Sequence, residues 1–152
     1  MISKKTKYGL KALIHLARHY DEGPILIADL AREERIPKKF LEAILLSLKN
    51  NGILQSKKGK GGGYYLGRPP GKITLGQAIR VMDGPLAPVP CVSETAYAKC
   101  SECDNELTCG IRLVMKDVRD AIAGILDGTT LADVLEKVDS AEESEKVLNF
   151  YI

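Results

Sequence analysis

The residues of this 152-residue chain best suited to chemistry are its four cysteines, which all fall within nineteen positions. Their spacing is C-x8-C-x2-C-x5-C, formed by Cys91, Cys100, Cys103 and Cys109. Thiolates are soft anionic ligands that suit zinc and iron. Four of them on one flexible loop suffice for a tetrahedral metal site or an iron–sulfur cluster. The spacing matches neither a ferredoxin run nor paired zinc-knuckle motifs, so it does not identify the metal.

The segment around these cysteines, from Asp83 to Leu107, is expected to be a long loop. It contains prolines at positions 85, 88 and 90 and shows no sustained apolar periodicity. Such a polar loop does not suit buried structural cysteines. Zinc, a metal-free thiol switch and a loop without sensing function remain the alternatives to a cluster. Cys109 falls at a predicted helix start, where the helix dipole favours the thiolate.

A second informative stretch is the run from Lys57 to Leu66, KKGKGGGYYL, which has three lysines and four glycines. Glycine allows the positive φ angles of a tight turn, so we expect a β-hairpin between short apolar runs. Lys57, Lys58 and Lys60 would lie at its tip, where they can contact a phosphate backbone. Such contacts add affinity and salt dependence but little sequence information.

The sequence before the hairpin predicts two helices, a short one near Ile27–Glu34 and an amphipathic one from Pro37 to Asn50. The apolar face of the second helix comprises Phe40, Leu41, Ile44, Leu45 and Leu48. Two helices followed by a basic hairpin are the layout of a winged helix-turn-helix that binds DNA.

Three polar residues near the start of the second helix are candidates for DNA contacts. Lys38 and Lys39 can meet phosphate or guanine, and Glu42 can accept a hydrogen bond from cytosine. From the residues alone, a surface carboxylate paired with Lys38 at i, i+4 is the better interpretation of Glu42.

The net charge of +2 conceals a basic half and an acidic half. Residues 1–80 carry sixteen Lys and Arg against six Asp and Glu, whereas residues 81–152 carry six against fourteen. The basic half therefore predicts a polyanionic partner. No apolar run approaches the ~20 residues of a membrane span, and the N-terminus lacks signal-peptide features. We expect no membrane association and a cytoplasmic protein.

Motifs of common enzyme classes are missing from the sequence. Gly71-Lys72 is followed by Ile73 rather than Ser or Thr, and the glycine run lacks the βαβ context of a dinucleotide site. His15 and His19 share a helix face without the glutamate of a zinc protease. A redox or metal-transfer enzyme is a rival interpretation, but the sequence offers no nucleophile and base pair for it. We expect a protein that is not an enzyme.

The remaining helices are predicted from caps and periodicity. Lys5–Tyr20 forms a first helix, and Thr74-x-x-Gln77 is a capping box that opens a helix over Leu75–Met82. Thr108 is predicted to cap a helix over Cys109–Leu126, whose apolar stripe resembles a coiled-coil seam. That stripe comprises Ile111, Val114, Val118, Ala121, Ile122 and Ile125.

Beyond Thr130 we expect one short helix and then an acidic, weakly ordered tail from Ser140 to Ile152. The predicted organisation is a DNA-binding domain over 1–82, a cysteine-rich sensor loop over 83–108, dimerisation and short helices over 109–138 and an acidic tail over 139–152.

Several of these segments together resemble one bacterial family. They are Tyr8-Gly-Leu-Lys-Ala-Leu, Pro37-Lys-Lys-Phe-Leu-Glu42, Leu48-Lys-Asn-Asn-Gly-Ile-Leu54, Gly61-Gly-Gly-Tyr64, Ile73-Thr-Leu-Gly76 and Thr130-Leu-Ala-Asp133. The family is the IscR/NsrR/CymR family of winged helix-turn-helix transcription regulators, and the resemblance covers nearly the whole chain.

The resemblance implies a mostly α-helical homodimer with a small β-hairpin wing and a long dimerisation helix, bound to a pseudo-palindromic operator in double-stranded DNA. It places Glu42 at a position used for base discrimination and Tyr64 in the wing that meets DNA.

For the loop, the resemblance implies iron–sulfur ligands at Cys91, Cys103 and Cys109, with a [2Fe–2S] cluster favoured over [4Fe–4S]. The sequence departs from the family at the fourth ligand: Arg112 stands where one relative has histidine, and Lys7 aligns near another's aspartate. Cys100 is the obvious substitute. The chain is therefore predicted to sense iron–sulfur, redox or nitric oxide status. The rivals are a cluster-free regulator of the cysteine-metabolism type acting with a protein partner, and a zinc or thiol-switch regulator.

Overall fold

The computed structural model describes residues 2–151, which form a mostly helical protein with one two-stranded antiparallel hairpin. The elements in chain order are α1 (Lys4–Arg18), α2 (Ile27–Glu34), α3 (Lys38–Asn50), β1 (Leu54–Lys57), β2 (Gly63–Leu66), the 3-10 turn η1 (Pro70–Lys72), α4 (Leu75–Asp83), the 3-10 turn η2 (Pro90–Val92), α5 (Gly110–Gly128) and α6 (Leu131–Tyr151). This confirms the predicted fold class.

A single hydrophobic core joins α1, α2, α3, α4, the hairpin and the first residue of α6. Helical spacing places Leu41, Ile44, Leu45 and Leu48 on the inner face of α3, where each is at most 1% exposed. Leu131, at the start of α6, is fully buried in the same cluster. The core therefore fixes α3 relative to the hairpin and ties the C-terminal helix to the DNA-binding half.

The hairpin pairs Leu54 with Leu66 and Lys57 with Gly63. Its second strand also meets the α1–α2 connection, because Ile25 and Tyr64 exchange two backbone hydrogen bonds of 2.9 Å. Gly63 has a φ of 144°, and a Cβ at this position would overlap the carbonyl of Ile25. Glycine at this position thus lets the hairpin dock against the helix-turn-helix.

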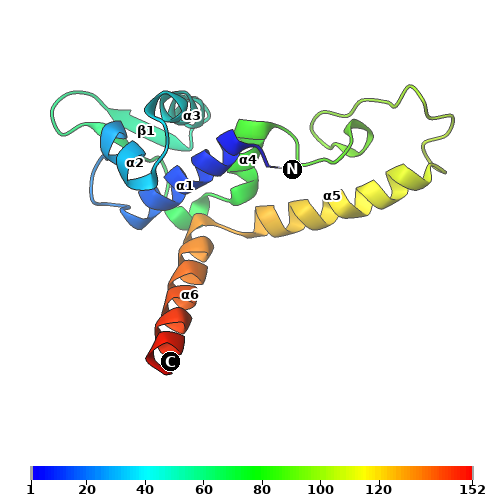
Figure 1. The fold of residues 1–152 in the computed structure, drawn as a ribbon. Coiled ribbons are helices and arrows are strands. Elements are labelled where there is room, and N and C mark those ends of the chain that lie inside the picture. Colours follow the sequence, from blue (N-terminus) through cyan, green and yellow to red (C-terminus); the bar gives the residue numbers. More distant parts are fainter. Residues whose placement is uncertain (1, 152) are drawn as a thin grey trace.

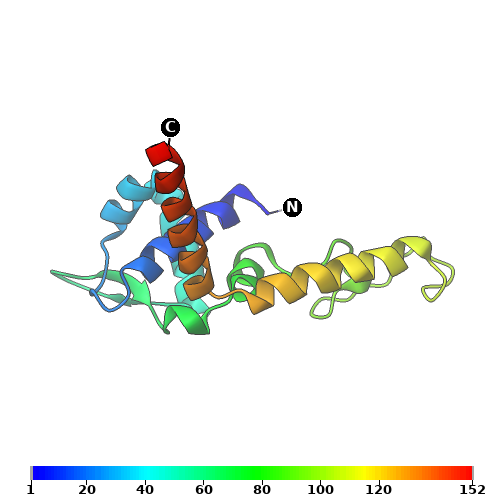
Figure 2. The ribbon, with the colours of Figure 1, turned by 90° about the horizontal axis from the view of Figure 1, so that it is seen from below.

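The C-terminal half extends away from this unit. Figure 1 shows α3 beside the hairpin, α5 projecting from the other side and α6 pointing away from both. Seen from below in Figure 2, the cysteine-containing segment runs along α5. Within residues 2–151, no helix combines the length and apolarity that crossing a membrane requires.

Most predicted boundaries are confirmed within two residues, including the Thr74–Gln77 capping box. Three predictions are wrong. Phe40 is 59% exposed rather than buried, because the other apolar residues of α3 already fill the core and Phe40 meets Tyr8 edge-on. The N-cap of α5 is Cys109 rather than Thr108. The helix after Thr130 is not short, since α6 continues through the supposed tail to Tyr151.

Candidate DNA interface and cysteine pocket

The first two turns of α3 present the predicted DNA-contacting side chains to solvent. Lys38, Lys39 and Glu42 are all exposed, on the opposite side of the helix from its buried face. No ion pair joins Lys38 to Glu42 in the part of the chain that the structure describes, so both remain available to a ligand. Two cations and one acceptor at the start of a recognition helix suit phosphate and base-edge contacts.

The wing places its cations as the sequence predicts. Lys57, Lys58 and Lys60 are exposed around the turn between β1 and β2. Tyr64 is different, because its side chain is half-buried and packs against the core. In this structure Tyr64 therefore helps to seat the wing, and its contact with DNA stays a prediction.

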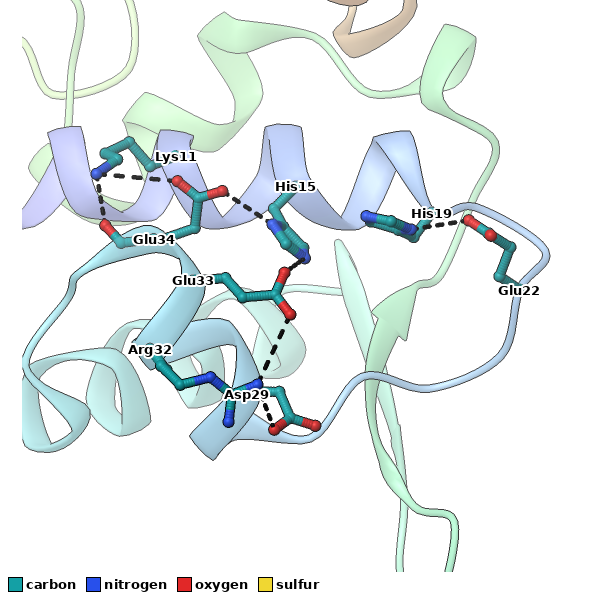
Figure 3. A network of polar contacts seen from close by, with 8 residues as sticks. All are labelled: Lys11, His15, His19, Glu22, Asp29, Arg32, Glu33 and Glu34. Carbon is teal, nitrogen blue, oxygen red and sulfur yellow. Dashed lines mark hydrogen bonds and ion pairs between the residues drawn. The ribbon is translucent and has the colours of Figure 1, made fainter.

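A polar network locks α1 to α2 and so positions the helix-turn-helix (Figure 3). His15 lies between two carboxylates of α2, with Nδ1 2.8 Å from Glu34 and Nε2 3.3 Å from Glu33. Lys11 donates to the backbone carbonyl of Glu34 over 2.6 Å. These contacts give His15 a structural role, and the ring of His19, the C-cap of α1, lies beside it with centroids 4.8 Å apart and planes tilted by 37°.

All four cysteines line one pocket of about 450 Å³ at the start of α5. Cys91, Cys103 and Cys109 are half-buried free thiols, and Cys100 is exposed. A hydrogen bond from the backbone N–H of Cys103 to the carbonyl of Cys100 forms a turn between these two residues. Within residues 2–151, no three potential ligands are close enough to hold a metal ion. The loop thus gathers the thiols around one space without closing them into a finished site.

Two of the thiols are electrostatically distinct. Backbone N–H groups of Arg112 and Ile111, in the first turn of α5, and a hydrogen bond from Cys103 lower the pKa of Cys109, with the group of Arg112 contributing most. Partial burial raises the pKa of Cys103, and donating to Cys109 raises it further. Of these two thiols, Cys109, the one at the helix start, is therefore the one that more readily becomes a thiolate.

Arg112 also lines the cysteine pocket, and its Nε is buried without a hydrogen-bond partner among the described residues. A buried guanidinium N–H is costly unless an acceptor meets it. Glu106 lines the same pocket, but it accepts a 2.6 Å hydrogen bond from the Tyr97 hydroxyl instead. The four thiols are suitable ligands for an iron–sulfur cluster, and the positive charge of Arg112 beside them suits the negative charge of such a group.

Arg119 fastens the beginning of the cysteine loop to the middle of α5. Its Nη1 donates to the backbone carbonyl of Val92 over 2.6 Å, and its Nη2 lies 3.5 Å from Glu94. The side chain is only 13% exposed and also pairs with Asp120. These contacts fix the beginning of the cysteine loop against the middle of α5.

Nothing in residues 2–151 covers the apolar stripe of α5. No residue of α5 is buried, and the exposed apolar side chains include Ile111, Val114, Val118, Ile122 and Ile125. The predicted stripe is thus present on a long projecting helix.

The fold and these surfaces define a winged helix-turn-helix DNA-binding protein with a cysteine-bearing appendage. Residues 2–137 match Rrf2, a family described as "Iron-dependent Transcriptional regulator". The chain belongs to the Rrf2 family of transcription regulators, whose members are DNA-binding regulators rather than enzymes. The predicted family is thereby confirmed.

Three relatives illustrate the similarity. The chain is 40% identical over 138 residues to an rrf2-like HTH-type transcriptional regulator of Rhodobacter capsulatus, covering 89% of this chain and 92% of that protein. The solved structure of CymR, the global cysteine regulator of B. subtilis, is 34% identical with a TM-score of 0.75, covering 90% of this chain and 97% of CymR. That of T. potens IscR is 30% identical with a TM-score of 0.73, covering 93% and 90%.

Local sequence patterns do not reveal the contact that Arg119 makes, and they mark Arg112 only as a departure from the family. Val92 and Arg119 are 27 positions apart, so no local spacing links them. One feature of the sequence could have drawn attention to Arg112: it is a cation three residues after the last cysteine, at the start of a predicted helix.

Proposed function

We propose that this regulator is a homodimer that holds an iron–sulfur cluster in its cysteine pocket and binds operator DNA through α3 and the wing. The observation that carries the proposal is the pocket itself, where four thiols surround one space beside the unpaired Arg112. The family description and the similarity to a protein named IscR support iron over other metals. By resemblance, [2Fe–2S] is favoured over [4Fe–4S].

The homodimer is supported by the uncovered stripe of α5. Apolar stripes of this length on a projecting helix are normally buried against another protein surface. A second copy of α5 offers the same stripe, with spacing close to that of a coiled coil. Two-fold symmetry would then present two α3 helices to the half-sites of a pseudo-palindromic operator. Light scattering should give a dimer mass for the wild type and a monomer mass for Val118→Glu.

The chain's own residues connect the pocket to the DNA-binding half. When bound, a cluster would supply one-electron redox chemistry and a charge that depends on its state. Cys109 is the N-cap of α5, so movement of this ligand moves the helix start. Arg119 holds the loop to the middle of α5, and Arg80 of α4 holds Asp127 near its end. Changes at the pocket would therefore reach α4 and the core through α5.

The decisive experiment is an absorption spectrum and an iron assay of protein purified without oxygen. Visible sulfide-to-iron charge-transfer bands are expected in the wild type. Cys91→Ala, Cys103→Ala and Cys109→Ala should lose both colour and iron, and Cys100→Ala tests the fourth ligand. Ser101→Ala, which changes the same pocket without removing a thiol, is the control and should keep its iron. Unchanged iron content in the cysteine variants would exclude the cluster.

A cluster-free regulator is the second candidate, and two observations favour it. The chain is similar over most of its length to CymR, and within residues 2–151 its thiols are not assembled into a metal-binding group. Such a regulator, of the cysteine-metabolism type, would act with a protein partner. Colourless protein that contains no metal and still binds DNA would support this alternative, whereas zinc in the metal assay would indicate a zinc-dependent regulator.

A further inference from the structure

Two arginines of the described chain, Arg68 and Arg112, have a buried Nε without a hydrogen-bond partner, and of these Arg112 lines the cysteine pocket. Arg18 and Arg80, by contrast, pair with Asp139 and Asp127. Between residues 2 and 151, Arg112 forms no ion pair, although Glu106 lines the same pocket, and its Nε is buried and unsatisfied. A cation left unpaired at the wall of a cavity indicates that the cavity's occupant supplies the missing acceptor.

The position of Arg112 narrows the chemistry of that occupant. It lies in the first turn of α5, three residues after Cys109, and lines the same pocket as all four thiols. Guanidinium keeps its proton in proteins, so Arg112 acts as a donor and a fixed positive charge rather than as a metal ligand. Sulfur atoms bound to iron carry negative charge and accept hydrogen bonds from such donors.

We propose that Arg112 is a positioning residue of the cysteine pocket, donating from Nε to a sulfur atom of the bound iron–sulfur cluster and raising its reduction potential. This role rests on the proposed function, because it requires that the pocket hold a cluster. Reduction adds a negative charge to a group that is already anionic. A nearby fixed cation and hydrogen-bond donor stabilise the reduced form more than the oxidised form.

The test compares reduction midpoints of anaerobically purified wild type, Arg112→Gln and Arg112→Lys, followed by visible absorption during dye-linked titration. Arg112→Gln should retain its iron and show a lower midpoint, with about a tenfold smaller ratio of reduced to oxidised cluster at a fixed potential. For a one-electron couple that ratio corresponds to about 59 mV. Arg112→Lys, which keeps a charge but lacks Nε, should fall between the two.

Lys116→Gln is the matched control, because it removes a cation from the same helix at a residue paired with Asp120 outside the pocket. Its midpoint should equal that of the wild type. An unchanged midpoint in Arg112→Gln, or an equal shift in Lys116→Gln, would overturn the role of Arg112 while leaving the cluster established.

Two further outcomes are also decisive. If Arg112→Gln loses its iron, the midpoint of Arg112→Lys decides the matter: a value below wild type supports the proposal, and the wild-type value overturns it. Wild-type protein purified without oxygen that contains no iron would overturn the proposed cluster and this role together.

Discussion

Arg80 and Asp127 are joined by two parallel hydrogen bonds, from Nη1 to Oδ1 over 2.6 Å and from Nη2 to Oδ2 over 2.8 Å. Arg80 belongs to α4 in the DNA-binding half, and Asp127 lies in the last turn of α5. A bidentate pair fixes the orientation of its partners as well as their distance. It therefore holds the end of α5, and with it the projecting helix, against α4.

The stabilising effect of this pair should depend on pH. Hydrogen bonding to Arg80 lowers the pKa of Asp127 below its ordinary value, partly opposed by burial. Because the pKa of this carboxyl is lower in the folded protein than in the unfolded chain, the carboxylate stabilises the fold when the pH is above the unfolded-state pKa, about 3.9 for Asp. The stabilisation is lost as the pH falls through the lower, folded-state pKa. Urea unfolding should thus find Asp127→Asn less stable than wild type at pH 7, with a smaller difference below about pH 4. A difference independent of pH would contradict this assignment.

A double-mutant cycle tests the close approach of α4 to Asp127. A Cβ at Gly76 would overlap Asp127 Oδ1, so Gly76→Ala should break the ion pair and destabilise the wild type. In an Asp127→Ala background the carboxylate is gone, and the remaining close neighbour is Arg80 Nη1 at 3.1 Å, the end of a flexible side chain that no longer has its partner. There Gly76→Ala should stabilise by about 0.5–1 kcal/mol, because alanine is the better helix former. Gly124→Ala, a helical glycine with open space around it, is the control. Equal effects in both backgrounds would disprove the contact.

Removing the Arg119 anchor should loosen the cysteine loop. Arg119→Gln loses the charged donor to the Val92 carbonyl, an interaction worth about 1.5–3 kcal/mol. Hydrogen exchange in apo protein should therefore speed up around Val92 and Ser93, which are buried in the wild type. The exchange of α3 should be unchanged. Lys116→Gln, at a nearby exposed cation, should leave the loop protected, and equal protection in Arg119→Gln would refute the anchor.

The wing lysines should contribute affinity without sequence preference. If Lys57, Lys58 and Lys60 each contact one phosphate, replacing all three with Ala should reduce the slope of log K against log salt by about 2.7. The ranking of operator sequences should stay the same. Lys146→Ala serves as the control, because it lies on α6, the helix that points away from α3 and the wing (Figure 1). An unchanged salt slope in the triple variant would remove the wing from the DNA interface.

The DNA-binding half was predictable because its signals are local. The buried face of α3, the capping box at Thr74 and the glycine-rich hairpin each follow from spacing within one element. Phe40 shows the limit of that logic. The apolar face of α3 is wider than the surface that the core covers, so one of its residues stays exposed. The sequence does not say which one, and the structure shows that it is Phe40, which packs against Tyr8.

The C-terminal half was less predictable, for two reasons. From Ser140 onward the chain has little apolar periodicity, so α6 had to be recognised from residues of high helix propensity such as Ala141, Glu142 and Lys146. The contacts that hold α5 join residues far apart in sequence, 47 positions for Arg80 and Asp127. Cysteine spacing indicated a shared site but could not show that Arg112 lines it.

Glu42 is the residue for which the sequence left two roles open, and its substitution distinguishes them. It is exposed near the start of α3 and forms no ion pair with Lys38 among residues 2–151, which favours a role in reading a base.

Sites selected from random DNA by the wild type define the operator. Glu42→Ala should then lose about 1–3 kcal/mol of discrimination at one base pair in each half-site. Affinity for non-specific DNA should be equal or higher, because a negative charge near phosphates has been removed. Glu136→Ala, an exposed carboxylate of α6, should keep the wild-type preference. If Glu42→Ala selects the same operator with the same ranking of variants, Glu42 is a surface carboxylate and other side chains of α3 read the base.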